Sequence, residues 1–233
     1  MAFCLAGAGL PCSAQFLPSL QAKTPEEFDD YLLVAGAVEP KQVTKAAARF
    51  AERWPSSELA VRVFELQLEA YRKLGDARNA LAAGERGLAA AADYLPLLAE
   101  TAAIEANETS EAARLARAKG RAERALQLLA SATAPRSLRP EEWEAATGRV
   151  ASKAHAALGM VAFKRGETAA AIREFEEAMR LHPAPGDATQ KYRLAMLYRE
   201  AGRKAEARAL LEQVVRSGEV VLERMAREAL REF

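Results

Sequence analysis

The feature that most constrains the fold is a pattern of small and apolar residues that recurs around Gly166 and Gly202. Each glycine stands between two stretches whose apolar residues follow the spacing of an amphipathic helix. Because glycine adopts positive φ at little cost, it favours the tight turns that end helices. The pattern therefore predicts consecutive helical hairpins, with a degenerate third copy around Gly75.

The composition favours helices along the whole chain. Half of the residues are hydrophobic, yet only 6% are aromatic, and isoleucine occurs at Ile104 and Ile172 alone. Alanine, leucine, arginine and glutamate are abundant, and these residues lose little rotamer freedom in a helix. No alternation of apolar and polar residues indicates a strand. We therefore expect an all-α protein. The bias towards alanine and arginine is also typical of high-GC bacteria.

Start and stop signals predict about eleven helices joined by short loops, so that neighbours in sequence pack antiparallel. Thr24, Pro25 and Glu27 form a capping signal for the first helix. The proline-rich stretch from Ser131 to Arg139 is interpreted as a linker. The predicted organisation is an N-terminal segment (1–22), degenerate helical hairpins (23–132) and C-terminal repeats with a capping helix (133–233).

The recurring pattern resembles the tetratricopeptide repeat, a helix–turn–helix unit of about 34 residues. Its clearest copies span 152–185 and 188–221, and a degenerate copy spans 61–94. The resemblance implies a right-handed superhelical solenoid of antiparallel helix hairpins. His155, Ala162, Gly84 and Gly87 depart from the family pattern. The positions that carry the resemblance are Leu158, Gly159, Phe163, Gly166, Ala171, Phe175, Ala178, Leu181 and Pro183, then Leu194, Ala195, Tyr198, Gly202, Ala207, Leu211 and Val214.

The resemblance also implies a groove lined by the first helix of each hairpin. Exposed Met, Phe and Tyr beside Lys and Arg would suit an extended peptide or a helix of another protein. The alternative is that Met160 and Phe163 pack beneath a neighbouring helix. Where peptide-binding members carry asparagine, this chain has Ala157 and Arg193. The groove positions are Lys153, Ala156, Met160, Phe163 and Lys164, then Thr189, Tyr192, Met196, Arg199 and Glu200, and in the degenerate copy Arg62, Glu65, Glu69, Arg72 and Lys73.

A second candidate surface is a basic stripe formed by Arg114, Arg117, Arg121 and Arg124, whose spacing places them on one helix face. The stripe could bind an acidic partner or an anionic surface. The favoured interpretation is a solvated face that pairs with nearby glutamates. At the other end of the chain, the last helix carries Val221, Leu222, Met225, Ala229 and Phe233 on its apolar side, which predicts a cap for the final hairpin.

Motifs for catalysis are not found, and the function classes that need them are not favoured. The two histidines, His155 and His182, have no metal-ligand pattern around them, and no serine elbow or phosphate loop occurs. The net charge of +1 gives no basic excess of the kind that nucleic-acid binders carry. We expect no enzyme activity, no cofactor or metal, no nucleic acid and no transmembrane segment.

The N-terminal segment has the features of an export signal. No charge precedes Lys23, the run from Phe3 to Leu10 is apolar, and small residues at Cys12 and Ala14 match the spacing that signal peptidase reads. Both cysteines lie in this segment. We expect a periplasmic or secreted protein that is cleaved after Ala14. The alternative is a floppy or helix-capping tail on a cytosolic protein.

The sequence thus predicts a non-catalytic module for protein–protein interaction or scaffolding, in a bacterial cell envelope or secreted, with a protein or peptide as its partner. One alternative is a cytosolic adaptor or regulatory module. Another is an enzyme of unrecognised type.

Overall fold

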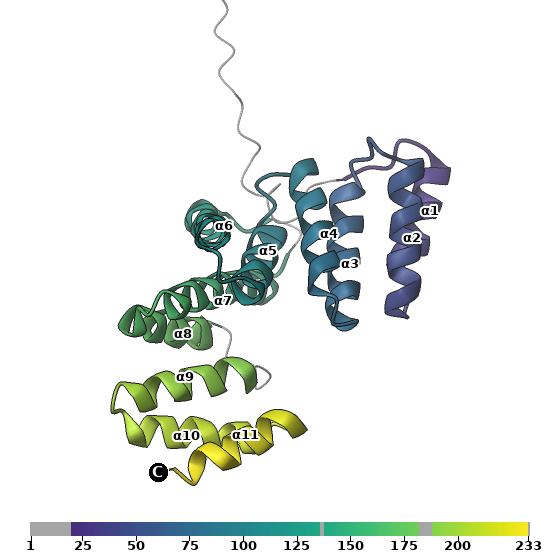
Figure 1. Cartoon of the computed structure of the whole chain (residues 1–233). Helices are drawn as coiled ribbons and strands as arrows, with labels where there is room; N and C mark the ends of the chain where they lie inside the picture. The colour runs from purple at the N-terminus through teal and green to yellow at the C-terminus, as the bar shows by residue number, and fades with distance from the viewer. Residues whose placement is uncertain (1–19, 136–137, 182–187, 233) are drawn as a thin grey trace, which may run out of the picture. The chain divides into compact units, whose positions relative to one another are not determined.

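The structure is a computed structural model that describes residues 20–135, 138–181 and 188–232. These residues form eleven α-helices and no strand, which confirms the all-α prediction (Figure 1). No helix in this part of the chain is long and apolar enough to cross a membrane. The helices are α1 (Pro25–Ala35), α2 (Pro40–Arg53), α3 (Ala60–Lys73), α4 (Ala77–Ala90), α5 (Leu95–Glu108), α6 (Ala112–Ser131), α7 (Pro140–Lys164), α8 (Thr168–Leu181), α9 (Ala188–Glu200), α10 (Lys204–Val215) and α11 (Val220–Leu230).

The predicted start of the first helix is confirmed. The Thr24 hydroxyl accepts a hydrogen bond from the backbone N–H of Glu27 at 3.2 Å, and Pro25 occupies the first turn. The return bond differs from a standard capping box, because the Glu27 carboxylate accepts from the backbone N–H of Lys23 at 2.6 Å. The carboxylate therefore reaches one residue further back than the capping signal predicts.

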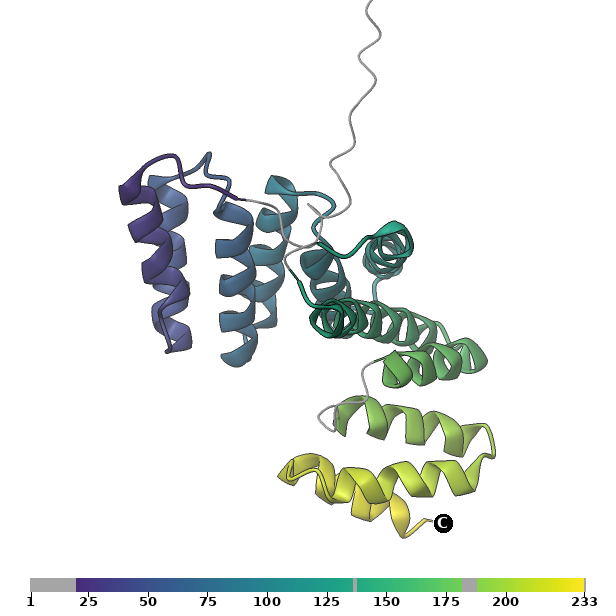
Figure 2. The same cartoon turned by 180° about the vertical axis from the view of Figure 1, so that it is seen from behind.

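The chain divides into two compact units, and each is described by itself. Unit 1 comprises Met1–Thr101 and Arg124–Trp143. In it, α1, α2, α3 and α4 pack against one another in sequence order, and they lie side by side in Figures 1 and 2. Leu20 and Ala22 pack against the core of this unit. The core residues are Val34, Val43, Ala47, Phe50, Leu59, Val63 and Ala70.

Two glycines of α4 let the fifth helix approach closely. A Cβ at Gly84 would lie 2.3 Å from Cγ2 of Thr101, and a Cβ at Gly87 would lie 2.2 Å from Cδ1 of Leu97. Both glycines depart from the repeat pattern, and their lack of a side chain is what admits Thr101 and Leu97. The departure therefore has a packing role.

Unit 2 comprises Ala102–Glu123 and Glu144–Phe233. Here α9 packs on α8 and α10, and α11 packs on α10 and α9. The α7–α8 hairpin is closed by the Ser152 hydroxyl, which donates to the Ala178 carbonyl at 2.7 Å. Gly159 faces the Phe175 ring, where an added Cβ would lie 3.1 Å from ring atoms. The missing side chain at Gly159 thus lets α7 and α8 approach closely.

The last helix packs on α10 as predicted, but of the described residues on its expected apolar side only Ala229 is buried. Ala226 and Ala229 supply its buried contact, whereas Val221 and Met225 remain exposed. The apolar side expected from the sequence is therefore only partly buried. Phe233 lies outside the described residues, as does His182.

The same turn ends α3, α7 and α9. Gly75, Gly166 and Gly202 have φ of 73°, 75° and 76°. At each turn, the residue after the glycine donates to the carbonyl five positions back, as in Glu167 N–H to Ala162 O at 2.9 Å, and the glycine donates to the carbonyl three positions back, as in Gly166 N–H to Phe163 O at 3.0 Å. This pair of bonds is the Schellman motif. The predicted copies, the degenerate one included, therefore share one turn geometry.

The Gly166 turn provides a direct test of this geometry. Gly166→Ala should lower the free energy of unfolding by about 1 kcal/mol, because alanine at positive φ is strained. Gly166→Asn should lose less, since asparagine tolerates this region. No atom lies within 4 Å of the added Cβ, so a steric clash cannot cause the loss. Urea denaturation followed by circular dichroism would measure both variants, and equal losses would contradict the backbone explanation.

Candidate functional site

The groove positions on α7 differ in their exposure. Met160 is 3% exposed, so its predicted place among the groove residues is wrong: the side chain is part of the core of unit 2. Phe163, one turn further along, is 45% exposed. Lys153 and Ala156 are half-buried. Of the two apolar side chains expected on this helix, only Phe163 is available to a partner.

Lys164 has a structural role within unit 2. Its ammonium donates to the carbonyl oxygens of Asn107 and Thr109, each at 2.6 Å, and so satisfies backbone groups at the end of α5. Burial and the nearby charge of Arg193 lower the pKa of Lys164. Arg193 in turn donates to the Asn107 side-chain oxygen at 2.8 Å. The basic side chains expected to face a partner here instead hold the end of α5.

The second set of groove positions lies on α9. Thr189, Tyr192 and Met196 are half-buried, so each keeps part of its surface accessible. Arg199 forms an ion pair with Glu232 at 2.6 Å. The apolar part of the predicted groove that stays accessible is therefore Phe163 on α7 together with Tyr192 and Met196 on α9. We call these three residues the C-terminal apolar set.

In the degenerate copy, the charged groove positions are paired with one another. Arg62 forms an ion pair with Glu65, and both bind the buried Tyr94: the Arg62 guanidinium donates to the Tyr94 hydroxyl, which donates to Glu65, each at 2.8 Å. Burial and the Glu65 carboxylate raise the pKa of Tyr94. Arg72 pairs with Glu69 at 3.0 Å. Arg62 and Glu65 thus tie α3 to Tyr94, the residue before α5, a role that the sequence analysis did not predict.

The basic stripe is a cluster around one buried carboxylate. Glu105 on α5 has no exposed surface, and its oxygens accept hydrogen bonds from Arg114 at 3.3 Å, from Arg117 Nε at 3.0 Å and from Arg121 at 3.2 Å. The fourth arginine, Arg124, pairs with Asp93 at 2.7 Å. The arginines are therefore paired, as the favoured interpretation expects, but three of them pair with one buried glutamate and not with glutamates at the surface.

The electrostatics of Glu105 follow from this geometry. Burial raises the pKa of a carboxylate, because it penalises the charged form. The hydrogen bonds and charges of Arg117, Arg121 and Arg114 outweigh burial and hold the pKa of Glu105 below its ordinary value. The carboxylate is therefore ionised at neutral pH and fixes the arginines of α6 against α5.

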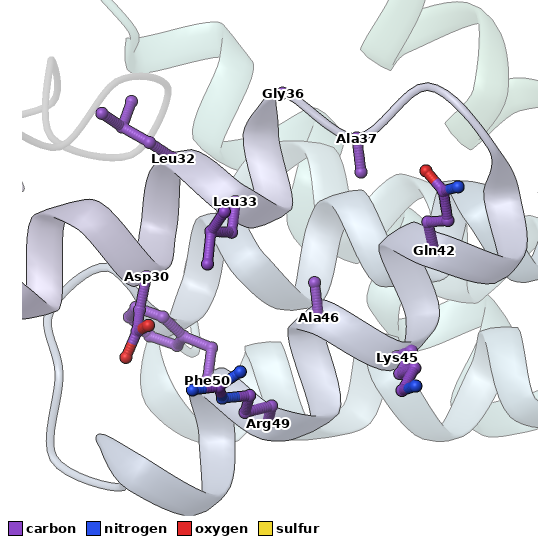
Figure 3. Close-up of a pocket in the computed structure, with 10 residues that line it drawn as sticks. All are labelled: Asp30, Leu32, Leu33, Gly36, Ala37, Gln42, Lys45, Ala46, Arg49 and Phe50. Atoms are coloured by element: carbon purple, nitrogen blue, oxygen red, sulfur yellow. The ribbon is translucent and has the colours of Figure 1, made fainter.

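A hollow that the sequence analysis missed lies between α1 and α2 in unit 1. It has a volume of about 560 Å³ and is lined by both helices and the turn between them. Figure 3 shows Leu33, Ala37 and Ala46 pointing into this space, with Lys45 and Arg49 along α2 at its edge. We call this hollow the α1–α2 groove. The sequence contains one indication of this groove. Leu32 and Leu33 are adjacent in α1, and because adjacent helical residues point in different directions, both cannot face the core.

Within the described residues, no three His, Cys, Asp or Glu side chains gather in a way that could hold a metal ion. His155 accounts for one of the two histidines: its Nδ1 lies 2.8 Å from a Glu174 carboxylate oxygen across the α7–α8 hairpin. This contact places His155 at the interface between α7 and α8.

Comparison with known proteins identifies the repeats. The sequence model described as tetratricopeptide repeat matches residues 162–219. A solved structure of TTC0263, a thermophilic TPR protein in Thermus thermophilus, is 21% identical, with a TM-score of 0.51, and covers 88% of this chain and 98% of its own. A crystal structure of MamA protein is 15% identical, with a TM-score of 0.52, and covers 83% and 91%. At such identities the likeness concerns the fold. No curated protein sequence matches the chain.

Proposed function

From the tetratricopeptide repeats over residues 162–219, we propose that the chain is a non-catalytic module that binds another protein and holds it in an assembly. Helical repeat proteins use extended surfaces of this kind for binding. The observation that carries the proposal is the exposed ring of Phe163 on the first helix of the matched region. An aromatic side chain at the surface of a binding helix is typical of the residues that dominate interface energies.

The partner of the C-terminal apolar set is an apolar segment of another protein. Two of the charged groove positions, Lys164 and Arg199, are engaged within the chain. Binding at this surface therefore rests on apolar burial by Phe163, Tyr192 and Met196, and its affinity should depend only weakly on salt.

Site-specific photo-crosslinking tests this proposal. A photo-reactive phenylalanine at position 163, expressed in the organism that encodes the chain, should give a defined crosslink to a second protein. The same group at the exposed Ala205 of α10 should give none. With the purified partner, Phe163→Ala should weaken the affinity at least about tenfold, as expected for an aromatic hot spot. Identical products at both positions, or an unchanged affinity, would refute the proposal.

We also propose that this assembly is in a bacterial cell envelope or outside the cell. Supporting it are the uncharged segment before Lys23 and the small residues at Cys12 and Ala14. Cleavage after Ala14 would leave Leu20 and Ala22 in place against the core of unit 1. N-terminal sequencing of the mature protein should begin at Gln15. A chain that still begins at Met1 would support the cytosolic alternative.

A further inference from the structure

The first helix has its polar and apolar sides reversed. Phe28, Leu32 and Leu33 are 47%, 48% and 60% exposed, whereas Glu27 and Asp30 are buried at 1% and 8%. A surface helix ordinarily turns its apolar side to the core and its charges to water. A helix side that faces only water is ordinarily polar. The exposed apolar side chains of α1 therefore give its outer side the composition of a surface that binds another molecule.

Polar bonds keep α1 in this orientation. Asp30 accepts hydrogen bonds from the Arg53 guanidinium and from the Trp54 indole N–H, each at 2.8 Å. Glu27 accepts from the backbone of Lys23. These bonds hold Asp30 and the Oε2 atom of Glu27 in place, while Val34 of α1 lies in the hydrophobic core and Tyr31 packs against it. Because these bonds fix the orientation of α1, Leu32 and Leu33 stay on its exposed side.

The α1–α2 groove continues this apolar surface inward. Leu33 and Ala37 form one wall and Ala46 the other, and the fully buried Phe50 contributes its floor (Figure 3). Its volume of about 560 Å³ falls within the range of sites that bind organic ligands or side chains. The groove can therefore accept two or three aliphatic side chains from a partner.

The edge of the groove on α2 is basic. Lys41, Lys45, Arg49 and Arg53 are spaced four apart and share one helix face. Lys45 and Arg49 line the groove. The carboxylate among the described lining residues is Asp30, and it is already bonded to Arg53 and Trp54. The surface therefore presents a positive edge beside an apolar floor.

We propose that the α1–α2 groove binds an acidic amphipathic helix of another protein, whose leucine-type side chains enter the groove while flanking Asp or Glu residues pair with Lys45 and Arg49. A helix is the occupant that fits, because in unit 1 each helix from α1 to α4 packs beside the next, and α1 and α2 form its first hairpin. This inference rests on the proposed binding function, but it names a second surface, in unit 1, and the chemistry of its partner.

Two labelled peptides serve as probes for the full chain. Both have leucines at helical spacing; one carries glutamates beside the leucines and the other carries lysines at the same positions. Fluorescence anisotropy should show saturable binding of the glutamate peptide, at least tenfold tighter than that of the lysine peptide. The binding should weaken as salt rises, because charge pairs at an exposed edge are screened.

Variants locate the site. Leu33→Asp, at an exposed position that leaves folding unaffected, should weaken glutamate-peptide binding at least tenfold. Lys45→Glu combined with Arg49→Glu should reverse the preference between the two peptides. Val220→Asp on α11, an exposed apolar position in unit 2, should change nothing. Circular dichroism spectra that match the wild type establish that each variant is folded.

Several results would overturn this inference. Binding that Leu33→Asp and the charge reversal leave unchanged would place the peptide elsewhere. A dimer in analytical ultracentrifugation that Leu33→Asp dissociates would assign the groove to a second copy of the chain. Peptide binding that occurs only after residues 1–19 are removed would assign the groove to that segment. Phe163→Ala should leave peptide binding intact, so failure of this inference is separable from failure of the proposed function.

Discussion

Replacing Glu105 by alanine should lower the free energy of unfolding by about 3–5 kcal/mol, the loss expected when one partner of a buried ion pair is removed. Arg114, Arg117 and Arg121 all donate to this carboxylate, which has no exposed surface. Without it, three guanidinium groups would face a small cavity and one another. Urea denaturation at neutral pH, followed by circular dichroism, would measure the loss.

Two further variants separate charge from volume. Glu105→Gln keeps the shape of the side chain but removes its charge, so most of the loss should remain. Glu123→Gln on α6 is the matched control, because Glu123 forms an exposed pair with Lys119 at 3.3 Å. Such surface pairs contribute little, and no measurable change is expected. If Glu105→Gln were as stable as the wild type, the arginine cluster would not depend on the charge of Glu105.

The same carboxylate predicts a pH dependence. Its pKa is lowered in the folded state, so its contribution to stability is complete above the unfolded value of about 4.3. As pH falls through that value towards the folded pKa, the contribution disappears, since protonation costs more in the folded protein. The wild type should therefore lose stability as pH falls below the unfolded value of about 4.3, more steeply than Glu105→Gln does. Parallel curves for the two proteins would contradict this explanation.

Adding methyl groups where α4 meets α5 should also destabilise the protein. The double variant Gly84→Ala/Gly87→Ala should lower the free energy of unfolding by about 2–4 kcal/mol, since overpacking a tight contact costs about 1–3 kcal/mol at each site. The added Cβ atoms would lie 2.3 Å from Cγ2 of Thr101 and 2.2 Å from Cδ1 of Leu97, so these buried side chains, or α5 itself, would have to shift. The gain in helix propensity from alanine, about 0.8 kcal/mol per site, is too small to compensate.

Gly120 provides the matched control for this prediction. It also lies inside a helix, α6, but no atom stands within 4 Å of an added Cβ. Gly120→Ala should therefore raise stability by up to about 1 kcal/mol through helix propensity alone. If the double variant of α4 were stabilised to a similar extent, the close approach of α5 to Gly84 and Gly87 would be refuted.

The helices and turns were predictable from the sequence because their signals are local. Thr24 and Pro25 mark the first helix, Pro140 marks the long α7, and glycines mark the ends of α3, α7 and α9. Each of these signals works through backbone geometry within a few residues. The tetratricopeptide resemblance followed from the same pattern and agrees with the match over residues 162–219.

The pairing of side chains was not predictable, because it depends on helices that meet only after folding. Arg114, Arg117 and Arg121 were recognised as one face, but their partner Glu105 lies on the preceding helix. The sequence does contain one indication that Glu105 is the partner. Glu105 lies between Ile104 and Ala106, which are both buried, and a charge at a buried position needs an oppositely charged partner. The roles of Tyr94 and Lys164 likewise come from contacts between segments that are far apart in the sequence.

The α1–α2 groove was missed for a different reason. Sequence reasoning assigns the apolar residues of a helix to the core, and on α1 that rule fails. The periodicity of α1 places Phe28, Tyr31, Leu32 and Val34 on one apolar side, but the structure leaves Phe28 and Leu32 exposed and buries Glu27 and Asp30 beside Val34. The acidic residues that hold α1 find their partners, Arg53 and Trp54, at the end of α2. The orientation of α1 therefore depends on contacts that exist only when α1 and α2 have packed together.

The repeated Schellman turns have a consequence for the order in which the chain folds. Each turn at Gly75, Gly166 and Gly202 closes with hydrogen bonds between residues three and five positions apart, so its hairpin needs no distant segment in order to begin. Contacts so close in sequence form early and fast. The bonds from Lys164 to Asn107 and from Arg193 to Asn107 span 57 and 86 positions, and they must wait until separate hairpins have met. Hydrogen exchange during refolding should therefore protect the hairpin amides first and the end of α5 last.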